Sequence, residues 1–330
     1  MKVTVVGAGI VGLCAAWALT RRGVSVTVVE KGPIPNPTAA SADHHRMIRR
    51  AYPRNPGYGA RMDAAYGAWD RLFADFAADG AGPDTRFLKR VGVLTLSERP
   101  GDYGDETRRL FREQGTPHEA LEGPDAIGAR LPHLDVEGLT SNALTAILAE
   151  GGALMANRIL VALADWLRHA GVEIYELSPA TAIDRESATV TLASGHEIEG
   201  DLVIATAGAG MPTLLPGTLP LQYRRTLILY ARPPEDLAEA WENAPCWSGL
   251  GGDDDLWGIA PVEGIAPKLG AGALGRIDAD DMDRLPTPAE ETRILAAYRG
   301  RFRGIERFTP LCAQANYWML APGERFFLKR

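Results

Sequence analysis

Three glycines near the N-terminus, Gly7, Gly9 and Gly12, have the GxGxxG spacing of a dinucleotide-binding turn. The first would allow a sharp turn, the second would let the backbone approach a pyrophosphate, and the third would let a helix pack closely on a strand. Ile10 and Val11 lie between the second and third glycines, where free N–H groups of a helix N-terminus bind phosphate oxygens. This spacing favours the binding of a dinucleotide cofactor.

An acidic residue follows where such a site requires one. Glu30 ends a second apolar run, where its carboxylate can accept hydrogen bonds from an adenosine ribose, and Lys31 stands beside it. A carboxylate at this position favours an unphosphorylated ribose, and therefore FAD or NAD over NADP. Pro33, Pro35 and Pro37 then interrupt regular structure. Since a nicotinamide enzyme usually continues with further βα units, the prolines favour FAD.

A second polar cluster lies in residues 41–52, SADHHRMIRRAY. Arg46 and Arg49 are three apart, which would place them on one face of a helix. His44 and His45 precede them, but two adjacent histidines cannot both face one metal ion from a helix, and no cysteine or carboxylate stands at ligand spacing, so we predict no metal site. From composition alone, the cluster could equally be a solvated basic turn.

Composition excludes several classes of protein. The 330 residues carry 35 Lys and Arg against 42 Asp and Glu, a net charge of -7 that argues against nucleic-acid binding. Cys14, Cys246 and Cys312 are too few and too scattered for a disulfide framework, which fits a reducing compartment. A membrane-spanning helix needs about 20 consecutive apolar residues, and the glycines interrupt the longest N-terminal run. We therefore expect a cytoplasmic protein without membrane or nucleic-acid partners.

The elements that must position these residues can be predicted from the sequence. Residues 2–29 read as strand, glycine-rich turn, helix, turn and second strand, which is a complete βαβ unit. Residues 190–199 alternate around Ser194 and Gly195 as a β-hairpin does. Residues 202–205 form a short continuous apolar run, which suits a strand buried on both faces.

The sequence resembles a known family along nearly its whole length. GAGIVGLCAAWALTRRGVSVTVVEK followed by RMIRRAY is similar to the D-amino-acid oxidase (DAO) superfamily of FAD-dependent oxidoreductases, and within it to the monomeric sarcosine oxidase and N-methyltryptophan oxidase branch. Residues 151–184, 190–210 and 220–233 extend the likeness. The resemblance implies an α/β fold with a Rossmann-like FAD-binding domain of the GR2 type and an α+β substrate domain with a mostly antiparallel sheet.

This layout makes the FAD-binding domain discontinuous. We expect it to comprise residues 1–80, 148–216 and 308–330, and the substrate-binding domain to comprise residues 81–147 and 217–307.

The resemblance assigns separate roles to three basic residues. Arg49 matches the position that binds the substrate carboxylate, a task suited to the planar guanidinium. Arg46 matches an arginine beside the flavin, and Lys268 matches the lysine of the family's KLG strand, which promotes the reaction of reduced flavin with oxygen. The resemblance further implies that the cofactor is lined by Ser41, Ala182, Ala207 and Gly208.

Cys312 is a candidate for covalent attachment of the flavin. The segment TPLCAQANYWMLAPGERFFL resembles the one in which sarcosine-oxidase-like enzymes bond the flavin 8α carbon to a cysteine. A thiolate is required, so its sulfur must be accessible. Cys312 lies farther from the ERFFL strand than in the family, and Gln314 replaces a frequent tyrosine. Covalent attachment and a structural role both remain open.

We expect an FAD-dependent oxidase of amines or amino acids, of the secondary-amine or N-methyl amino-acid type. The resemblance implies hydride transfer from the carbon next to nitrogen to flavin N5, hydrolysis of the imine, and reduction of O₂ to H₂O₂. The expected partners are a small amine bearing a carboxylate and O₂, with the protein a monomer or small homo-oligomer. Two alternatives are a flavin dehydrogenase or tailoring enzyme that acts on a cyclic amine or imino acid with another electron acceptor, and a non-catalytic flavin-binding protein.

Overall fold

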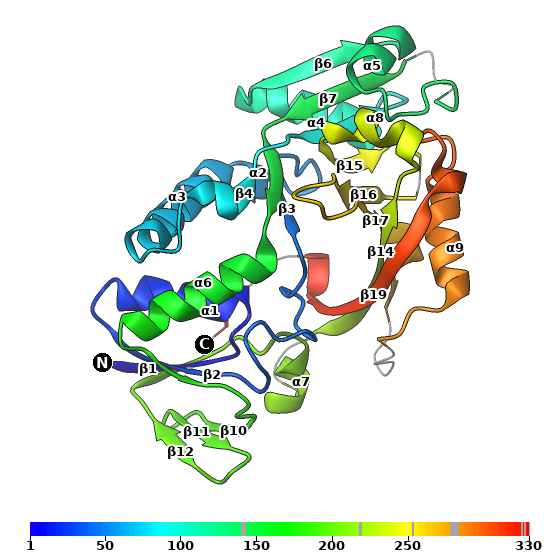
Figure 1. Cartoon of the computed structure of the whole chain (residues 1–330). Helices are drawn as coiled ribbons and strands as arrows, with labels where there is room; N and C mark the ends of the chain where they lie inside the picture. Colours follow the sequence, from blue (N-terminus) through cyan, green and yellow to red (C-terminus); the bar gives the residue numbers. More distant parts are fainter. Residues whose placement is uncertain are drawn as a thin grey trace.

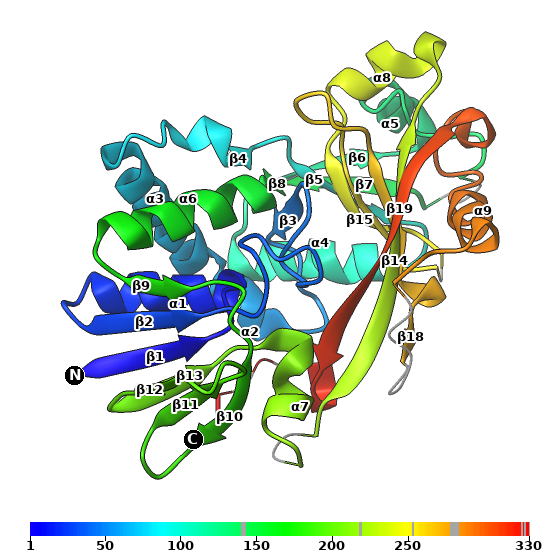
Figure 2. The same ribbon diagram turned by 60° about the horizontal axis from the view of Figure 1, so that its bottom comes forward.

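The computed structural model describes residues 1–139, 143–217, 220–252, 254–277, 284–324, 326 and 328–329. Two large sheets organise these residues. One is parallel, contains the N-terminal strand and is covered by helices; the other is mixed and mostly antiparallel (Figures 1 and 2). The predicted fold class, an α/β layer with a second, mostly antiparallel sheet, is confirmed.

The parallel sheet has the strand order β13-β1-β2-β9. Its strands are β1 (Lys2–Val6), β2 (Ser25–Val29), β9 (Glu173–Tyr175) and β13 (Leu202–Ala205). Helix α1 (Ile10–Thr20) joins β1 to β2, so the predicted βαβ unit is confirmed. Valines dominate the two central strands because each is buried on both faces.

Strand β13 differs from its prediction. It lies at the edge of the sheet and pairs only with β1 among the described strands, and the Leu202 side chain is 47% exposed. The prediction of a strand buried on both faces is wrong here because an apolar run does not reveal which strand ends a sheet.

Helices cover one face of the parallel sheet. Helix α6 (Ala156–His169) buries Ile159, Leu163 and Leu167, which are four apart and therefore share one face. These residues, α1 and helix α3 (Met62–Ala78) form a single apolar cluster with the central strands. Figure 1 shows α1 and α6 side by side over β1 and β2.

A small antiparallel sheet packs against the parallel sheet, since Val190, Leu192 and Ile198 form one apolar cluster with Val6 and Val29. Its strands are β10 (Ala180–Asp184), β11 (Thr189–Leu192) and β12 (Glu197–Glu199). The predicted hairpin is confirmed, since β11 and β12 pair around a turn in which Gly195 has φ +84°.

The large sheet has the order β18-β14-β17-β16-β15-β5-β7-β6, and β19 pairs with β14. Within this sheet, the pairing of β15 with β5 is the one parallel pairing among the described strands. The strands are β5 (Val93–Ser97), β6 (His118–Glu122), β7 (Thr145–Ala149), β14 (Gln222–Arg232), β15 (Cys246–Leu250), β16 (Leu256–Ile259), β17 (Lys268–Ala271), β18 (Arg276–Ile277) and β19 (Thr309–Leu320).

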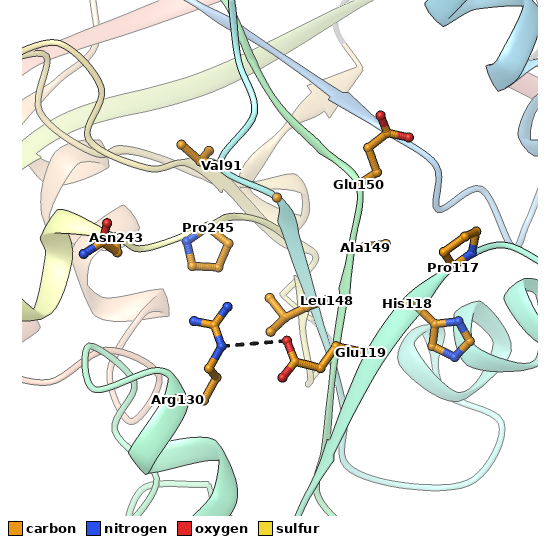
Figure 3. A pocket seen from close by; sticks show the side chains of 11 residues that line it. Val91, Pro117, His118, Glu119, Arg130, Leu148, Ala149, Glu150, Asn243 and Pro245 are labelled. Atoms are coloured by element: carbon orange, nitrogen blue, oxygen red, sulfur yellow. Dashed lines mark ion pairs between the residues drawn. The ribbon is translucent and has the colours of Figure 1, made fainter.

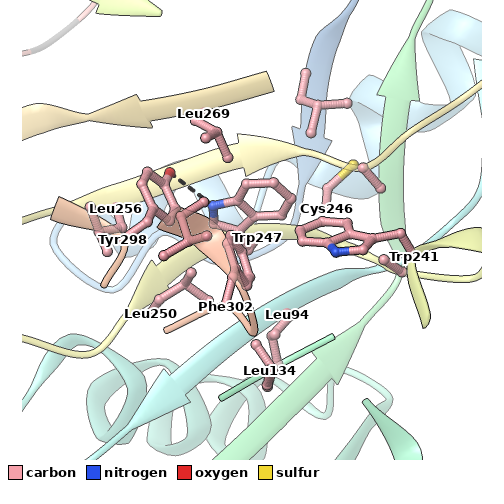
Figure 4. Packing of buried hydrophobic residues seen from close by; sticks show 14 of the residues in the cluster. Leu94, Leu134, Trp241, Cys246, Trp247, Leu250, Leu256, Leu269, Tyr298 and Phe302 are labelled. Atoms are coloured by element: carbon pink, nitrogen blue, oxygen red, sulfur yellow. Dashed lines mark hydrogen bonds between the residues drawn. The ribbon is translucent and has the colours of Figure 1, made fainter. Parts of the chain in front are cut away.

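Aromatic side chains pack one face of this sheet (Figure 4). Trp247 and Trp241 meet edge to face at 6.0 Å between ring centroids, and the Trp247 Nε1–H donates to the Tyr298 hydroxyl over 3.1 Å. Burial of each such ring contributes about 2–3 kcal/mol. This core fixes β15, β16 and β17, and therefore fixes the position of Lys268 at the start of β17.

A three-stranded sheet of order β3-β8-β4 lies between the two large ones. Its strands are β3 (Arg46–Arg49), β8 (Gly151–Leu154) and β4 (Leu88–Lys89). The helical face considered for Arg46 and Arg49 is therefore wrong: these residues form a strand, because β8 supplies an antiparallel partner for their backbone. Residues three apart on a strand point to opposite faces, so the two guanidinium groups serve different surroundings.

The remaining elements connect these sheets. The other helices are α2 (Pro56–Gly59), α4 (Tyr103–Gln114), α5 (Pro124–Arg130), α7 (Met211–Leu214), α8 (Ala238–Glu242) and α9 (Pro288–Ala297). Short 3₁₀ turns occupy Asp84–Arg86, Gly208–Gly210, Glu235–Leu237, Gly272–Leu274, Ile305–Arg307 and Pro322–Glu324. The predicted division into two discontinuous domains stays a prediction; β19, which lies in its 308–330 segment, pairs with β14.

Candidate active site

A cavity of about 890 Å³ opens at the carboxyl ends of β1 and β2. It is lined by the glycine-rich turn, the start of α1, the loop 36–41, α6 and residues 206–214. This volume lies near the upper end of the range that is typical of binding sites for small molecules and cofactors. Ligands of open parallel sheets bind at this end of the strands, so the cavity lies where the sequence places a dinucleotide.

The glycine-rich turn is packed so tightly that side chains would not fit. Gly7 has φ +105°, and a Cβ there would lie 2.6 Å from the carbonyl oxygen of Thr206. A Cβ on Gly12 would overlap the carbonyl oxygen of Gly7. The Ile10 N–H donates to the Ser41 Oγ over 3.1 Å, which fixes the start of α1. The turn is therefore a rigid backbone cradle beside the cavity.

Gly12→Ala should abolish cofactor binding and lower the melting temperature, because its Cβ meets backbone that cannot move away. We expect a stability loss of about 1–3 kcal/mol. Gly67→Ala is the matched control: Gly67 also lies in a helix, but its Cβ would meet only the Arg71 side chain at 3.6 Å. Flavin absorbance per protein and thermal unfolding measure both effects. Equal flavin content in the two variants would contradict the role of Gly12.

Glu30 is held at the cavity wall by donors from three segments. Its carboxylate accepts hydrogen bonds from the Ala8 N–H (2.8 Å), the Gly32 N–H (3.0 Å) and the Asn36 Nδ2 (2.8 Å). The side chain is buried and lines the cavity. A carboxylate has about four acceptor sites, so Glu30 keeps acceptor capacity for ribose hydroxyls.

The cavity brings together most of the predicted cofactor residues. Its lining includes Gly7, Gly9, Ile10, Val11, Glu30, Lys31, Ser41, Arg46, Ala207 and Gly208. Gly12 packs behind the turn and does not line the cavity. Ala182 is exposed and also lies outside the lining, to which its neighbours Ala180 and Thr181 contribute instead. The cavity lining also contains Asn36, Tyr223 and Arg284. Asn36 and Arg284 were not identified from the sequence; Arg284 comes from a distant loop and carries no local motif.

Lys268 lies at the centre of a buried polar cluster next to Arg46. Its Nζ donates to the Asp43 Oδ2 over 3.0 Å and to the carbonyl oxygen of His45 over 2.6 Å. Arg46 forms an ion pair with the same Asp43 oxygen, and the Tyr230 hydroxyl donates to the other oxygen over 2.5 Å. Asp43 was missed from the sequence, because nothing in the local pattern shows that it faces a lysine 225 residues away.

The pKa values in this cluster follow from burial and charge pairing. Burial alone would raise the pKa of Asp43, but Lys268, Arg46 and the Tyr230 hydroxyl outweigh it and lower the pKa to about 2. Burial lowers the pKa of Lys268 to about 8, and Asp43 partly opposes this shift. Burial likewise lowers the pKa of His45 to about 3, so its imidazole is neutral. Asp43 is therefore ionised at neutral pH.

Arg49 faces a different environment. Its guanidinium donates to Ser248 on β15 and lies over the Tyr52 ring, 5.0 Å from the centroid. The Tyr103 hydroxyl lies 3.5 Å from the Ser248 Oγ. A guanidinium has five N–H donors, so Arg49 keeps an edge with which it can bind a carboxylate bidentately.

Cys312 lies opposite Tyr230 in the β14–β19 pairing. Side chains directly opposite on antiparallel strands point to the same face, so Cys312 shares the face from which Tyr230 reaches Asp43. Its thiol is exposed and lies outside the lining of the cavity.

A second, more open pocket of about 550 Å³ lies on the large sheet (Figure 3). Its lining includes His118 and an ion pair between Glu119 and Arg130 at 3.7 Å. None of the residues predicted to act in catalysis or cofactor binding lines it. The 890 Å³ cavity is therefore the candidate active site.

The residues of the large cavity fit a flavin dinucleotide, because they offer a glycine cradle, a helix N-terminus and a ribose-binding carboxylate along one continuous surface. A family model described as FAD dependent oxidoreductase (DAO) matches residues 2–325. The chain belongs to this family, so it is an FAD-dependent oxidoreductase and FAD is its cofactor. The predicted family is confirmed.

Several relatives of known name are similar to the chain. The N-methyl-L-tryptophan oxidase of Yersinia pestis (strain Pestoides F) is 24% identical over 286 residues, which are 86% of this chain and 73% of the relative. The modified fructosyl peptide oxidase of Aspergillus nidulans has a TM-score of 0.78 and 19% identity, with 97% of this chain and 80% of that chain covered. NikD, an unusual amino acid oxidase essential for nikkomycin biosynthesis, has a TM-score of 0.78, 19% identity and coverage of 96% and 81%. The structural likenesses support the fold.

Within the described residues, no helix combines the length and the apolar character needed to cross a bilayer. The same residues contain no group of three or more His, Cys, Asp or Glu side chains arranged to hold a metal ion.

Proposed function

We propose that the protein is an FAD-dependent oxidase of small amines that bear a carboxylate, with O₂ as electron acceptor and H₂O₂ as product. The observation that carries this proposal is the position of Lys268. Its ammonium group binds residues 43 and 45, immediately before Arg46, which lines the cofactor cavity. A buried cation at that point favours negative charge that develops on oxygen.

The names of the relatives support an amine substrate. They include N-methyl-L-tryptophan oxidase, fructosyl amine: oxygen oxidoreductase and an amino acid oxidase. Each of these names specifies a substrate with a C–N bond, and two of the three, an N-methylated tryptophan and an amino acid, specify a substrate with a carboxylate. N-methyl amino acids are therefore the first compounds to test.

Each polar group has a defined task in this proposal. Bound FAD supplies the two-electron acceptor for the C–H bond next to nitrogen. Arg49 binds the substrate carboxylate with the donors that Ser248 leaves free. Arg46 supplies positive charge in the cavity lining, Lys268 adds a buried positive charge through the Asp43 carboxylate that both contact, and Glu30 binds the adenosine ribose. No protein base is required when the amine binds uncharged.

A panel of amines tests this function by peroxide release. We expect H₂O₂ from N-methyl amino acids and cyclic imino acids, and none from the corresponding amines without a carboxylate. Flavin that is bleached by substrate without peroxide release would instead support a dehydrogenase or tailoring enzyme. Flavin that no amine bleaches would support a non-catalytic flavin-binding protein.

We further propose that Cys312 attaches the flavin covalently at the 8α carbon, since its thiol is accessible and lies on the same face of the strand pair as Tyr230. The S–C bond would replace the S–H bond and one 8α C–H bond, both as protons lost, and the two electrons would reduce the flavin, which O₂ would reoxidise. After acid precipitation, the yellow colour should remain in the pellet of the natural protein and move to the supernatant for Cys312→Ser. Cys246→Ser is the control, because Cys246 is fully buried in the core of the large sheet and cannot reach the flavin. A yellow supernatant from the natural protein would leave Cys312 with a structural role only.

A further inference from the structure

The Asp43 carboxylate is shielded from solvent, and each of its two oxygens accepts two contacts from the protein. Its side chain is 0% exposed. One oxygen receives Lys268 and Arg46, and the other receives the Tyr230 hydroxyl at 2.5 Å and the His44 N–H at 2.8 Å. These donors come from β17, β3, β14 and the loop before β3, so a single carboxylate joins the large sheet to the cofactor cavity.

The same contacts fix the direction of the Lys268 ammonium group. An ammonium group has three N–H donors. Two of them are used by the Asp43 Oδ2 and by the carbonyl oxygen of His45. The direction of the third N–H follows from these two, and no acceptor takes it among the hydrogen bonds of the described residues.

We propose that Asp43 is a positioning residue that keeps Lys268 charged and correctly oriented beside the cofactor, and that it thereby controls the reaction with oxygen. This inference rests on the proposed oxidase function and assigns a role to a residue outside the motifs.

Charge balance in the cluster supports the proposal. Lys268 is almost fully buried, and the charge of Arg46 opposes its protonation. The other groups that face it are His45, which is neutral, the Tyr230 hydroxyl, whose pKa is raised by burial, and the buried thiol of Cys246. Asp43 is therefore the anion in the described cluster that favours the ammonium form.

Removal of this anion has a definite direction. An arginine stays protonated in proteins, so Lys268 is the group that must lose its proton when Asp43 is neutralised. The pKa of Lys268, about 8 with Asp43 present, would then fall by about 1–3. At pH 8, most Lys268 side chains would then be neutral, and Arg46 would be the positive charge that remains in the described cluster.

The test is the pH dependence of reoxidation by O₂ in Asp43→Asn, compared with the natural protein and Lys268→Met. The flavin is first reduced with dithionite, so no amine substrate is needed. We expect Asp43→Asn to be slower by about fivefold or more at pH 8, where about half of the Lys268 side chains of the natural protein are charged, and to recover as the pH falls toward 6. Lys268→Met should be slow throughout this range. An unchanged rate and pH profile in Asp43→Asn, or a faster reaction, would overturn the inference.

A measurement on the protein alone provides a second readout. Asp43→Asn and Lys268→Met should each lower the melting temperature, because each breaks the buried ion pair between Lys268 and Asp43. The double variant should lose less than the sum of the two, since the contact between Lys268 and Asp43 can be lost only once. Additive losses would overturn the pairing on which the inference depends. A natural protein that O₂ does not reoxidise would instead overturn the proposed oxidase function, whatever the variants do.

Discussion

Lys268→Met should slow the reaction of the reduced protein with oxygen by about 100- to 1,000-fold, while reduction by substrate changes far less. Lys268 is 1% exposed, and its ammonium group is fixed by two acceptors, one of which, Asp43, also pairs with Arg46 of the cavity lining. A preorganised buried charge of this kind stabilises negative charge more than a solvated one does. Methionine keeps the length and volume of the side chain and removes only its charge and donors. Stopped-flow absorbance measures the two half-reactions separately.

The control for this variant is Lys2→Met. Lys2 is exposed at the start of β1, and its side chain lies outside the cavity lining. Both half-reactions should keep their natural rates. Equal slowing of both half-reactions in Lys268→Met would show that Lys268 supports the site in general and has no special role toward oxygen.

Arg49→Ala should weaken the binding of carboxylate-bearing amines by about 10- to 100-fold, because hydrogen bonds to a charged group contribute about 1.5–3 kcal/mol. The content of bound FAD should not change, since Arg49 does not line the cofactor cavity. Arg49→Lys should recover only part of the affinity, because an ammonium group cannot bind a carboxylate bidentately. Titration of the flavin spectrum under anaerobic conditions gives the dissociation constants.

Arg50→Ala is the matched control for Arg49. Arg50 is the next residue along the chain, and its guanidinium pairs with Asp63 and Glu150. Its removal should leave substrate affinity unchanged. The account of Arg49 fails when Arg49→Ala binds carboxylate-bearing amines as tightly as the natural protein, or when the corresponding amides lose the same affinity.

The parts of the fold that follow local rules could be predicted from the sequence. The turn of Gly7 and Gly12, the βαβ unit around it and the hairpin at Gly195 depend on spacing within a few residues. The contact of Glu30 with the Ala8 N–H joins two ends of that same unit. Such features are encoded locally, so one sequence is sufficient to identify them.

The features that depend on distant partners could not be predicted in the same way. Arg46 and Arg49 form a strand because β8 lies beside them, although their spacing also suits a helix. Asp43 meets Lys268 and Tyr230 across more than 180 residues. Arg284 reaches the cavity from a loop without any motif. Tertiary packing decides each of these placements, so they cannot be predicted from the periodicity or the spacing of residues in the sequence.

One experiment tests the central claim most directly: anaerobic mixing of the purified protein with one equivalent of an N-methyl amino acid, followed by addition of O₂. The account predicts that substrate bleaches the flavin absorbance, that O₂ restores it, and that about one H₂O₂ is released per flavin. Flavin absorbance that no carboxylate-bearing amine bleaches, or bleached flavin that O₂ does not restore, would contradict it.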